Sequence, residues 1–186
     1  MAGNAADISL ASNALLLLGH QTIASFTEAT AGAEIASNLF DHSYKYILSI
    51  HRWRFASKQA RLARLAAKPQ NVFSYQFQLP TDLVYLIRAV GVRNYEIYGD
   101  KLYANDSDVS IEYVYNLDSS YLPSYYAKMF EYYLASQFAI PITGDIDKAS
   151  YYAQQYEKAL IKAKFIDSSQ RPNDGITDNP YVDVRG

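Results

Sequence analysis

Apolar residues recur at helical spacing through the first fifty residues of the chain. Four of them fall on one face of a helix predicted over residues 7–18, and Gly19 follows where helices often end in a left-handed residue. A second helix is predicted to begin near Thr30 and to end near Ile50. Its apolar residues cover more than half of the helix circumference, which favours burial on two sides, as in a bundle or a subunit interface.

Beyond residue 54 the period changes from that of a helix to that of a strand. Apolar and polar residues alternate over 72–79, and Pro80 ends the run. Residues 83–92 are almost continuously apolar and β-prone, which is typical of a strand covered on both faces. Residues 109–115 alternate again, so this part of the chain predicts antiparallel β-structure.

A hairpin is predicted over residues 95–104, with Gly99 and Asp100 as its two-residue turn. Glycine in the first turn position favours the type II′ turn, whose twist matches that of paired strands. Together with a less regular strand near 54–65, these segments predict a small antiparallel barrel or sandwich of about five or six strands.

Helical spacing returns after this β-rich stretch. Pro123, at a first helical position, is predicted to open a helix that ends near residue 139, because Pro141–Gly144 should break it. Residues 145–166 form the cleanest amphipathic segment of the chain. Its acidic start and lysine-rich end complement the helix dipole.

The predicted fold class is therefore α+β, a mainly α-helical bundle of about four helices with an inserted small antiparallel barrel or sandwich. The bundle is assigned to residues 1–53 together with 120–166, and the insert to 54–119. Residues 167–186 contain two prolines and two glycines and little apolar content, which predicts a flexible C-terminal arm. A short β-prone run in this arm could add a strand to the edge of a neighbouring sheet.

Composition limits the possible functions. The chain has no cysteine, which excludes disulfides, thiolate metal sites and cysteine nucleophiles, and suits assembly in a reducing cytosol. Its formal net charge of −2 argues against a free-standing nucleic-acid binder. The 18 tyrosines suit either a tyrosine-rich core or a surface that is wet before assembly and buried afterwards. No run is long enough to span a membrane, and no signal peptide is indicated.

Catalytic and metal-binding patterns do not stand out. The three histidines have no carboxylate at a convincing ligand spacing, and no nucleophile elbow or phosphate loop occurs. We therefore expect no catalytic residue, no cofactor and no metal site, and the chain is not expected to be an enzyme. Glu28, Asp108 and Glu112 are the acids that an acid–base mechanism would use, so a cell-wall or glycan hydrolase stays an alternative.

Between His42 and Thr81 there are seven lysines or arginines and no acidic residue. The stretch 45–68 could track a phosphate backbone, meet an acidic protein surface, or be a solvated face balanced by acids elsewhere. A DNA-binding module is therefore a second alternative. The candidate residues of this stretch are Arg52, Arg54, Lys58, Arg61 and Arg64.

Several segments, in this order, resemble the tail tubular protein A family, the head-to-tail adaptor or gatekeeper proteins of short-tailed, podovirus-type bacteriophages. The segments are ASNALLLLGHQTIASF at 11–26, HRWRFA at 51–56, ARLARLA at 60–66, YQFQLPTDLVYLIRAV at 75–90 and the aromatic stretch at 111–143. The resemblance covers most of residues 5–165, and the order and spacing of the motifs carry it. Arg52 stands where the family often has proline before the tryptophan.

The resemblance implies a structural protein of the virion that is assembled in the host cytoplasm. It would form a ring of twelve copies beneath the portal protein, at the junction between head and tail, and would continue the DNA channel. The implied partners are the portal protein, a tail nozzle similar to tail tubular protein B, tail fibres, and copies of the chain itself. Double-stranded DNA would pass through the ring without sequence specificity, and no membrane is involved.

The resemblance also suggests where these partners would bind. The C-terminal arm would contact the portal or a neighbouring copy through Arg171, Tyr181, Val182, Val184 and Arg185. The basic stretch would face an interface or the DNA channel. The predicted hairpin would lie on the tail side, through Tyr95, Tyr98, Gly99, Asp100 and Tyr103.

Overall fold

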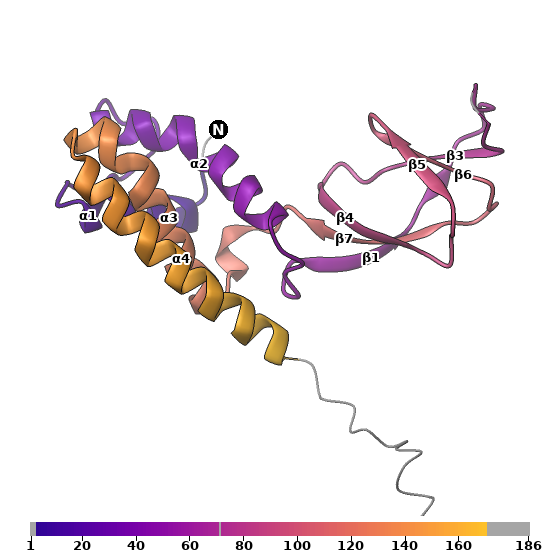
Figure 1. Cartoon of the computed structure of the whole chain (residues 1–186). Helices are drawn as coiled ribbons and strands as arrows, with labels where there is room; N and C mark the ends of the chain where they lie inside the picture. Colours follow the sequence, from indigo (N-terminus) through magenta and orange to yellow (C-terminus); the bar gives the residue numbers. More distant parts are fainter. Residues whose placement is uncertain (1–2, 71, 171–186) are drawn as a thin grey trace, which may run out of the picture.

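Four helices and two small antiparallel sheets make up the chain, as the computed structural model shows for residues 3–70 and 72–170 (Figure 1). The helices are α1 (Ala5–Leu17), α2 (Ala31–Ser49), α3 (Ser124–Thr143) and α4 (Ile146–Ser169), with a short 3-10 turn η1 (Ser119–Tyr121) before α3. The strands are β1 (Ser57–Arg61), β2 (Ala63–Arg64), β3 (Tyr75–Gln78), β4 (Leu83–Val90), β5 (Tyr95–Tyr98), β6 (Lys101–Ala104) and β7 (Ser110–Tyr115). The α+β prediction is confirmed, and all strands lie between α2 and α3 in the chain.

Local caps explain where the helices begin. At the start of α1, the side chain of Asn4 accepts a hydrogen bond from the backbone N–H of Asp7, and the side chain of Asp7 accepts one from the backbone N–H of Asn4. This reciprocal pair is a capping box. Thr30 and Asp145 cap α2 and α4 in the simpler way, each accepting from a backbone N–H three residues later. After α1, Gly19 takes a left-handed φ of 80°, as its place in the sequence predicts.

The predicted break at Pro141 is wrong, since α3 continues through this proline to Thr143. Pro141 lies in the last turn, where it removes only one backbone donor, so the helix tolerates it. The helix stops at Gly144, whose left-handed φ of 66° lets its N–H donate to the carbonyl of Ile140. Helix α4 also runs past its predicted end to Ser169, so residues 167–169 belong to the helix and not to an arm.

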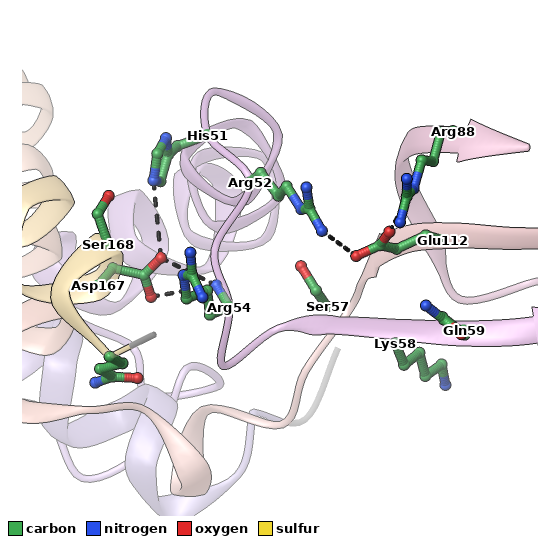
Figure 2. A pocket seen from close by; sticks show the side chains of 11 residues that line it. His51, Arg52, Arg54, Ser57, Lys58, Gln59, Arg88, Glu112, Asp167 and Ser168 are labelled. Atoms are coloured by element: carbon green, nitrogen blue, oxygen red, sulfur yellow. Dashed lines mark hydrogen bonds and ion pairs between the residues drawn. The ribbon is translucent and has the colours of Figure 1, made fainter. Parts of the chain in front are cut away.

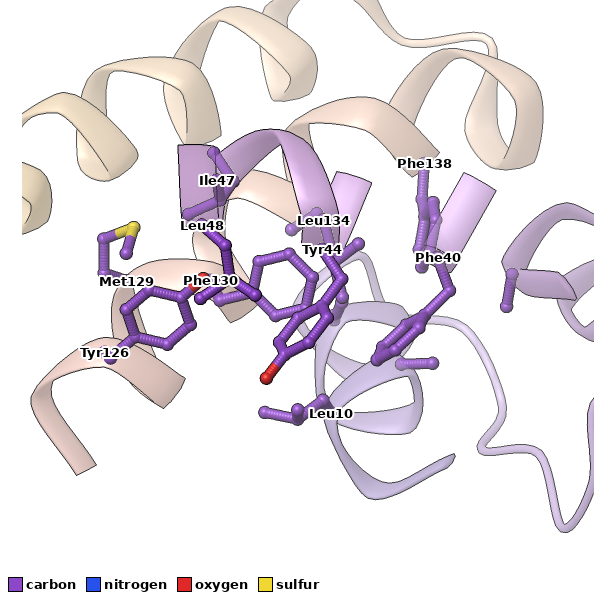
Figure 3. Packing of buried hydrophobic residues seen from close by; sticks show 14 of the residues in the cluster. Leu10, Phe40, Tyr44, Ile47, Leu48, Tyr126, Met129, Phe130, Leu134 and Phe138 are labelled. Atoms are coloured by element: carbon purple, nitrogen blue, oxygen red, sulfur yellow. The ribbon is translucent and has the colours of Figure 1, made fainter. Parts of the chain in front are cut away.

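The helices share one large apolar cluster, which is rich in aromatic rings (Figure 3). Trp53, at the exit from α2, is fully buried and donates its indole N–H to the carbonyl of Ile47. Its ring meets that of Tyr126 edge-on at 5.0 Å between centroids. The tryptophan therefore fixes the place where the chain leaves the helices for the sheets. Within the described ranges, no helix combines the length and the apolar character needed to cross a membrane.

The strands form two sheets, in the order β1-β7-β4 and β2-β3-β6-β5. They share a second, smaller apolar cluster, which includes Phe77, Leu102 and Ile111. Of the predicted barrel or sandwich, the barrel is wrong, because β4 ends one sheet and β5 ends the other without pairing to each other. The corner between the sheets lies at Leu62, whose N–H donates to the carbonyl of Val109.

Two predictions about individual strands can be compared with the structure. Strand β4 is an edge strand that is covered on both faces only in part: Val84 and Ile87 pack against the helical cluster and Leu86 against the sheet cluster, but Ala89 alone among its residues is buried. An apolar run alone cannot show how completely a second layer covers a strand. The predicted hairpin is confirmed, since β5 pairs with β6. Gly99 has a φ of 60° and Asp100 does not have a positive φ, which is the pattern of a type II′ turn.

Candidate functional site

A cleft of about 810 Å³ lies at the neck, which we define as residues 50–56, where the chain passes from α2 to β1. Figure 2 shows the side chains around it, which come from the neck, β1, β4, β7 and the end of α4; the side chain of Lys58 points away from Glu112, toward Asp82. The lining residues are His51, Arg52, Arg54, Ser57, Lys58, Gln59, Arg88, Glu112, Asp167, Ser168 and Gln170. Three of the five basic residues predicted from the sequence therefore meet in one place.

Glu112 lies at the centre of the sheet side of this cleft. It projects from β7, the central strand of its sheet, and only 9% of its side chain is exposed. The guanidinium of Arg88 on β4 donates to one carboxylate oxygen at 2.8 Å, and that of Arg52 from the neck donates to the other. Burial alone would raise the pKa of Glu112, but the two guanidinium groups outweigh it and lower that pKa. Glu112 thus fastens the neck to the sheet as a carboxylate.

Asp167 occupies the helical side of the cleft, in the last turn of α4, and is 1% exposed. Its two oxygens accept the backbone N–H of Arg54 at 3.2 and 3.1 Å, and Oδ1 also accepts the hydroxyl of Tyr125 at 3.0 Å. Nε2 of His51 lies 3.8 Å away. A carboxylate is unfavourable at a helix C-terminus, so these donors compensate for the helix dipole. Asp167 therefore fastens the neck to α4.

Burial also shifts the pKa values of two titratable neighbours of Asp167. Burial lowers the pKa of His51, and the carboxylate of Asp167 offsets part of that effect. Burial and the hydrogen bond to Asp167 both raise the pKa of Tyr125. At neutral pH the imidazole of His51 and the phenol of Tyr125 are therefore both neutral.

The basic stretch loses much of its free charge in three dimensions. Lys58 binds Asp82 at 2.5 Å, and Arg61 binds Asp108 at 2.6 Å. Arg64 lies over the ring of Tyr75, 5.2 Å from its centroid. Arg61 and Arg64 do not line the cleft.

Within the described residues, the guanidinium of Arg54 has no hydrogen bond or ion pair to an acid. By contrast, Arg52, Lys58 and Arg61 of the basic stretch are each paired with an acid from a distant part of the chain. A continuous basic track for a phosphate backbone is disfavoured.

The acids that a hydrolytic mechanism would need already have other partners. Glu28 accepts the backbone N–H of Ala24, Asp108 binds Arg61, and Glu112 binds two arginines. Among the residues that the structure describes, no three histidine, cysteine or acidic side chains are grouped as a metal site would require. The arrangement in the cleft can hold the neck in place, and it offers the exposed sides of Arg52, Arg54 and Arg88 to an anionic group.

Sequence reasoning missed three residues that complete or support the cleft, and it named Glu112 only as a candidate acid of a hydrolase. Arg88, Tyr125 and Asp167 carry no local signal, because each meets its partner only through the tertiary fold. Glu112 does carry one: it is a single acid between Ile111 and Tyr113 on a strand that is buried through its centre. A charged residue at such a position is rarely buried without a partner.

The other predicted site residues lie apart from the cleft. The hairpin belongs to the sheet on the side of the molecule away from the helices (Figure 1). At its turn, the ring of exposed Tyr98 lies 5.7 Å from that of Tyr103, and Asp100 accepts the side-chain amide of Gln78 at 3.0 Å. The predicted contacts of the C-terminal arm lie outside the described residues; they are Arg171, Tyr181, Val182, Val184 and Arg185.

No protein-family model matches this chain, and no curated protein matches it.

Proposed function

We propose that the chain is a structural head-to-tail adaptor of a short-tailed bacteriophage, as its resemblance to the tail tubular protein A family implies. In this proposal twelve copies form a ring beneath the portal protein, continue the DNA channel and dock the tail nozzle and fibres. The helical end faces the portal and the hairpin faces the tail. The protein acts by joining partners, so the proposal needs no reaction at the cleft.

The observation that carries this proposal is the exposure of large apolar side chains at two opposite ends of the molecule. At the helical end, Leu16, Ile140 and Ile146 are all exposed, where the last turns of α1 and α3 meet the first turn of α4. This end is the one farthest from the sheets (Figure 1). At the other end, Ile97 and Tyr98 of the hairpin are exposed. Contiguous exposed apolar surface often marks an interaction site, and the proposal assigns one partner to each end.

The neck supports the same proposal. An adaptor must keep its two binding ends in a fixed relation, so that a ring of copies presents one regular face to each partner. Glu112 and Asp167 fasten the neck to the sheet and to α4, respectively, through hydrogen bonds that involve charge. The cleft is thus interpreted as a structural joint between the two ends.

Binding of end-specific variants to a portal ring from the same genome tests this proposal. The double substitution Ile140→Asp and Ile146→Asp is expected to abolish binding to the portal, because it places charge on an apolar contact. Ile97→Asp is expected to leave portal binding intact and to weaken attachment of the nozzle. Val72→Asp, at a loop position that is 90% exposed, is the matched control and should change neither. Portal binding that survives the double substitution would contradict the assignment of the helical end.

A further inference from the structure

The outer face of α4 carries two large apolar side chains that no part of the described chain covers. Ile161 is 72% exposed and Phe165 is 73% exposed, and their spacing of four residues places them on one side of the helix. Lys158 and Lys162 are exposed beside them. On the opposite side of the helix, Ala163 is buried against the other helices. We call Ile161, Phe165 and these two lysines the α4 ridge.

A groove of complementary character lies elsewhere on the same chain. It consists of two adjoining hollows of about 610 and 430 Å³, which both include Leu117 and Asp118 in their walls. The larger hollow is lined by parts of α1 and α2, and the smaller by Phe55, Tyr115 and Tyr121. Tyr121 is 75% exposed at the mouth of the smaller hollow. We call the two hollows together the acidic groove.

The charges of the acidic groove are of one sign. Asp7, Asp41 and Asp118 line it, and no lysine or arginine does so within the described residues. Hydrogen bonds from Ser120 lower the pKa of Asp118, so this group is ionised at neutral pH. Asp41 also binds exposed Lys45 on α2. The groove therefore offers aromatic and aliphatic surface edged by carboxylates.

We propose that the α4 ridge of one copy docks into the acidic groove of the next copy. The match is both apolar and electrostatic: Phe165 meets the aromatic walls around Tyr121, while the lysines of the ridge meet the aspartates of the groove. The inference rests on the proposed function, which requires neighbouring copies in a ring. Because the ridge and the groove use different residues, the contact is heterologous, the type that produces rings when its rotation closes.

The absence of cysteine from the chain permits a direct test by disulfide trapping. Phe165→Cys is introduced in one full-length chain and Tyr121→Cys in a second full-length chain that carries a size tag. Both positions are mostly exposed, so the fold is expected to persist, and melting curves followed by circular dichroism verify it. A disulfide requires the two β-carbons to approach to about 4 Å, which makes the reaction specific for adjacent positions.

The mixture of the two cysteine variants is expected to form the mixed disulfide at least about tenfold faster than a mixture of Phe165→Cys with Val72→Cys. The Val72→Cys chain is the matched control, because that position is exposed but lies in neither surface. Equal rates in the two mixtures would overturn the proposal. Faster pairing of Phe165→Cys with itself would overturn it as well, because that result indicates a symmetric contact between ridges.

Charge reversal on the ridge adds a second readout. Lys158→Glu together with Lys162→Glu, in the Phe165→Cys chain, is expected to slow the mixed disulfide severalfold, and added salt should slow the reaction of the parent pair. A rate that ignores both changes would contradict the electrostatic part of the proposal. Failure of this inference is distinguishable from failure of the proposed function. A chain that binds a portal ring in many copies, without trapping between positions 121 and 165, would remain an adaptor with a different neighbour contact.

Discussion

The helical part and the sheet part of this chain complete their surfaces in different ways. The helices bury one large aromatic cluster, and α1, α2 and α4 begin at side-chain caps, so their first backbone N–H groups are partly satisfied within the helical part itself. The sheets share a smaller cluster and end in the edge strands β4 and β5, which leave backbone groups and apolar side chains available. The comparison indicates that the helices supply the larger core, whereas the sheets leave edge-strand backbone groups exposed in addition to apolar side chains.

The largest effect on stability is expected from replacing Trp53, which anchors the neck in the helical cluster. Trp53→Ala should lower the free energy of unfolding by about 3–5 kcal/mol, because it leaves a cavity among aromatic rings and removes the bond to Ile47. Urea unfolding followed by circular dichroism at the helical band measures this. Phe77→Ala, in the sheet cluster, is the counterpart and should leave most of the helical signal in place. Equal loss of helix in both variants would show that the two parts unfold as one unit.

The next largest effect on stability is expected at the neck, which joins the helices to the sheets. Asp167→Ala should destabilise the protein by about 3 kcal/mol, since it leaves the N–H of Arg54 and the hydroxyl of Tyr125 without their acceptor. Hydrogen exchange at the Arg54 amide should become faster in this variant. Ser168→Ala changes the exposed neighbour and is expected to alter neither quantity. Unchanged exchange at Arg54 would argue against a fastening role for Asp167.

A smaller and pH-dependent effect is expected on the sheet side of the neck. The folded pKa of Glu112 is lowered, so the stabilisation from its carboxylate is fully present above the unfolded pKa of about 4.3 and is lost as the pH falls through the folded pKa. Glu112→Gln should therefore cost about 1–3 kcal/mol at pH 7 and less below pH 4. Denaturant unfolding of both proteins between pH 3 and 7 measures the difference, and a difference independent of pH would contradict the account.

The smallest effect is expected inside the helical cluster, and its sign is opposite. The hydroxyl of Tyr126 is buried and has no hydrogen-bond partner among the described residues. Removing an unsatisfied buried hydroxyl while keeping the ring is expected to be neutral or to stabilise by up to about 1 kcal/mol. Thermal unfolding of Tyr126→Phe tests this, with Tyr44→Phe as the control, because the hydroxyl of Tyr44 donates to Leu117 and its loss should destabilise. A destabilised Tyr126→Phe variant would indicate an unseen partner.

The sequence predicts the helical part well because its signals are local. Thr30 and Asp145 mark helix starts within three residues of their partners, and Gly99 sets its turn by its own φ. Pro141 misleads because its effect depends on how near the helix end lies. Strand periodicity does not show the order of strands in a sheet, so it cannot predict that β4 and β5 do not pair with each other.

The candidate site is harder to predict than the fold. The sequence singles out Arg52, Arg54 and Lys58, and the structure places all three at the cleft. It does not indicate that Glu112 and Asp167 would meet them, because these contacts join residues about 60 and 113 positions apart. Three basic residues of a stretch that is free of acids in sequence thus line a cleft that also contains two buried acids.

The central claim is that this chain joins a portal ring to a tail, and the mass of the complex tests it most directly. Light scattering should be performed on the purified chain, on a portal ring from the same genome, and on their mixture. The account predicts that the mixture gains about 250 kDa over the portal alone, the mass of twelve copies of a 21.0 kDa chain. A portal ring whose mass is unchanged by excess chain would contradict the adaptor function.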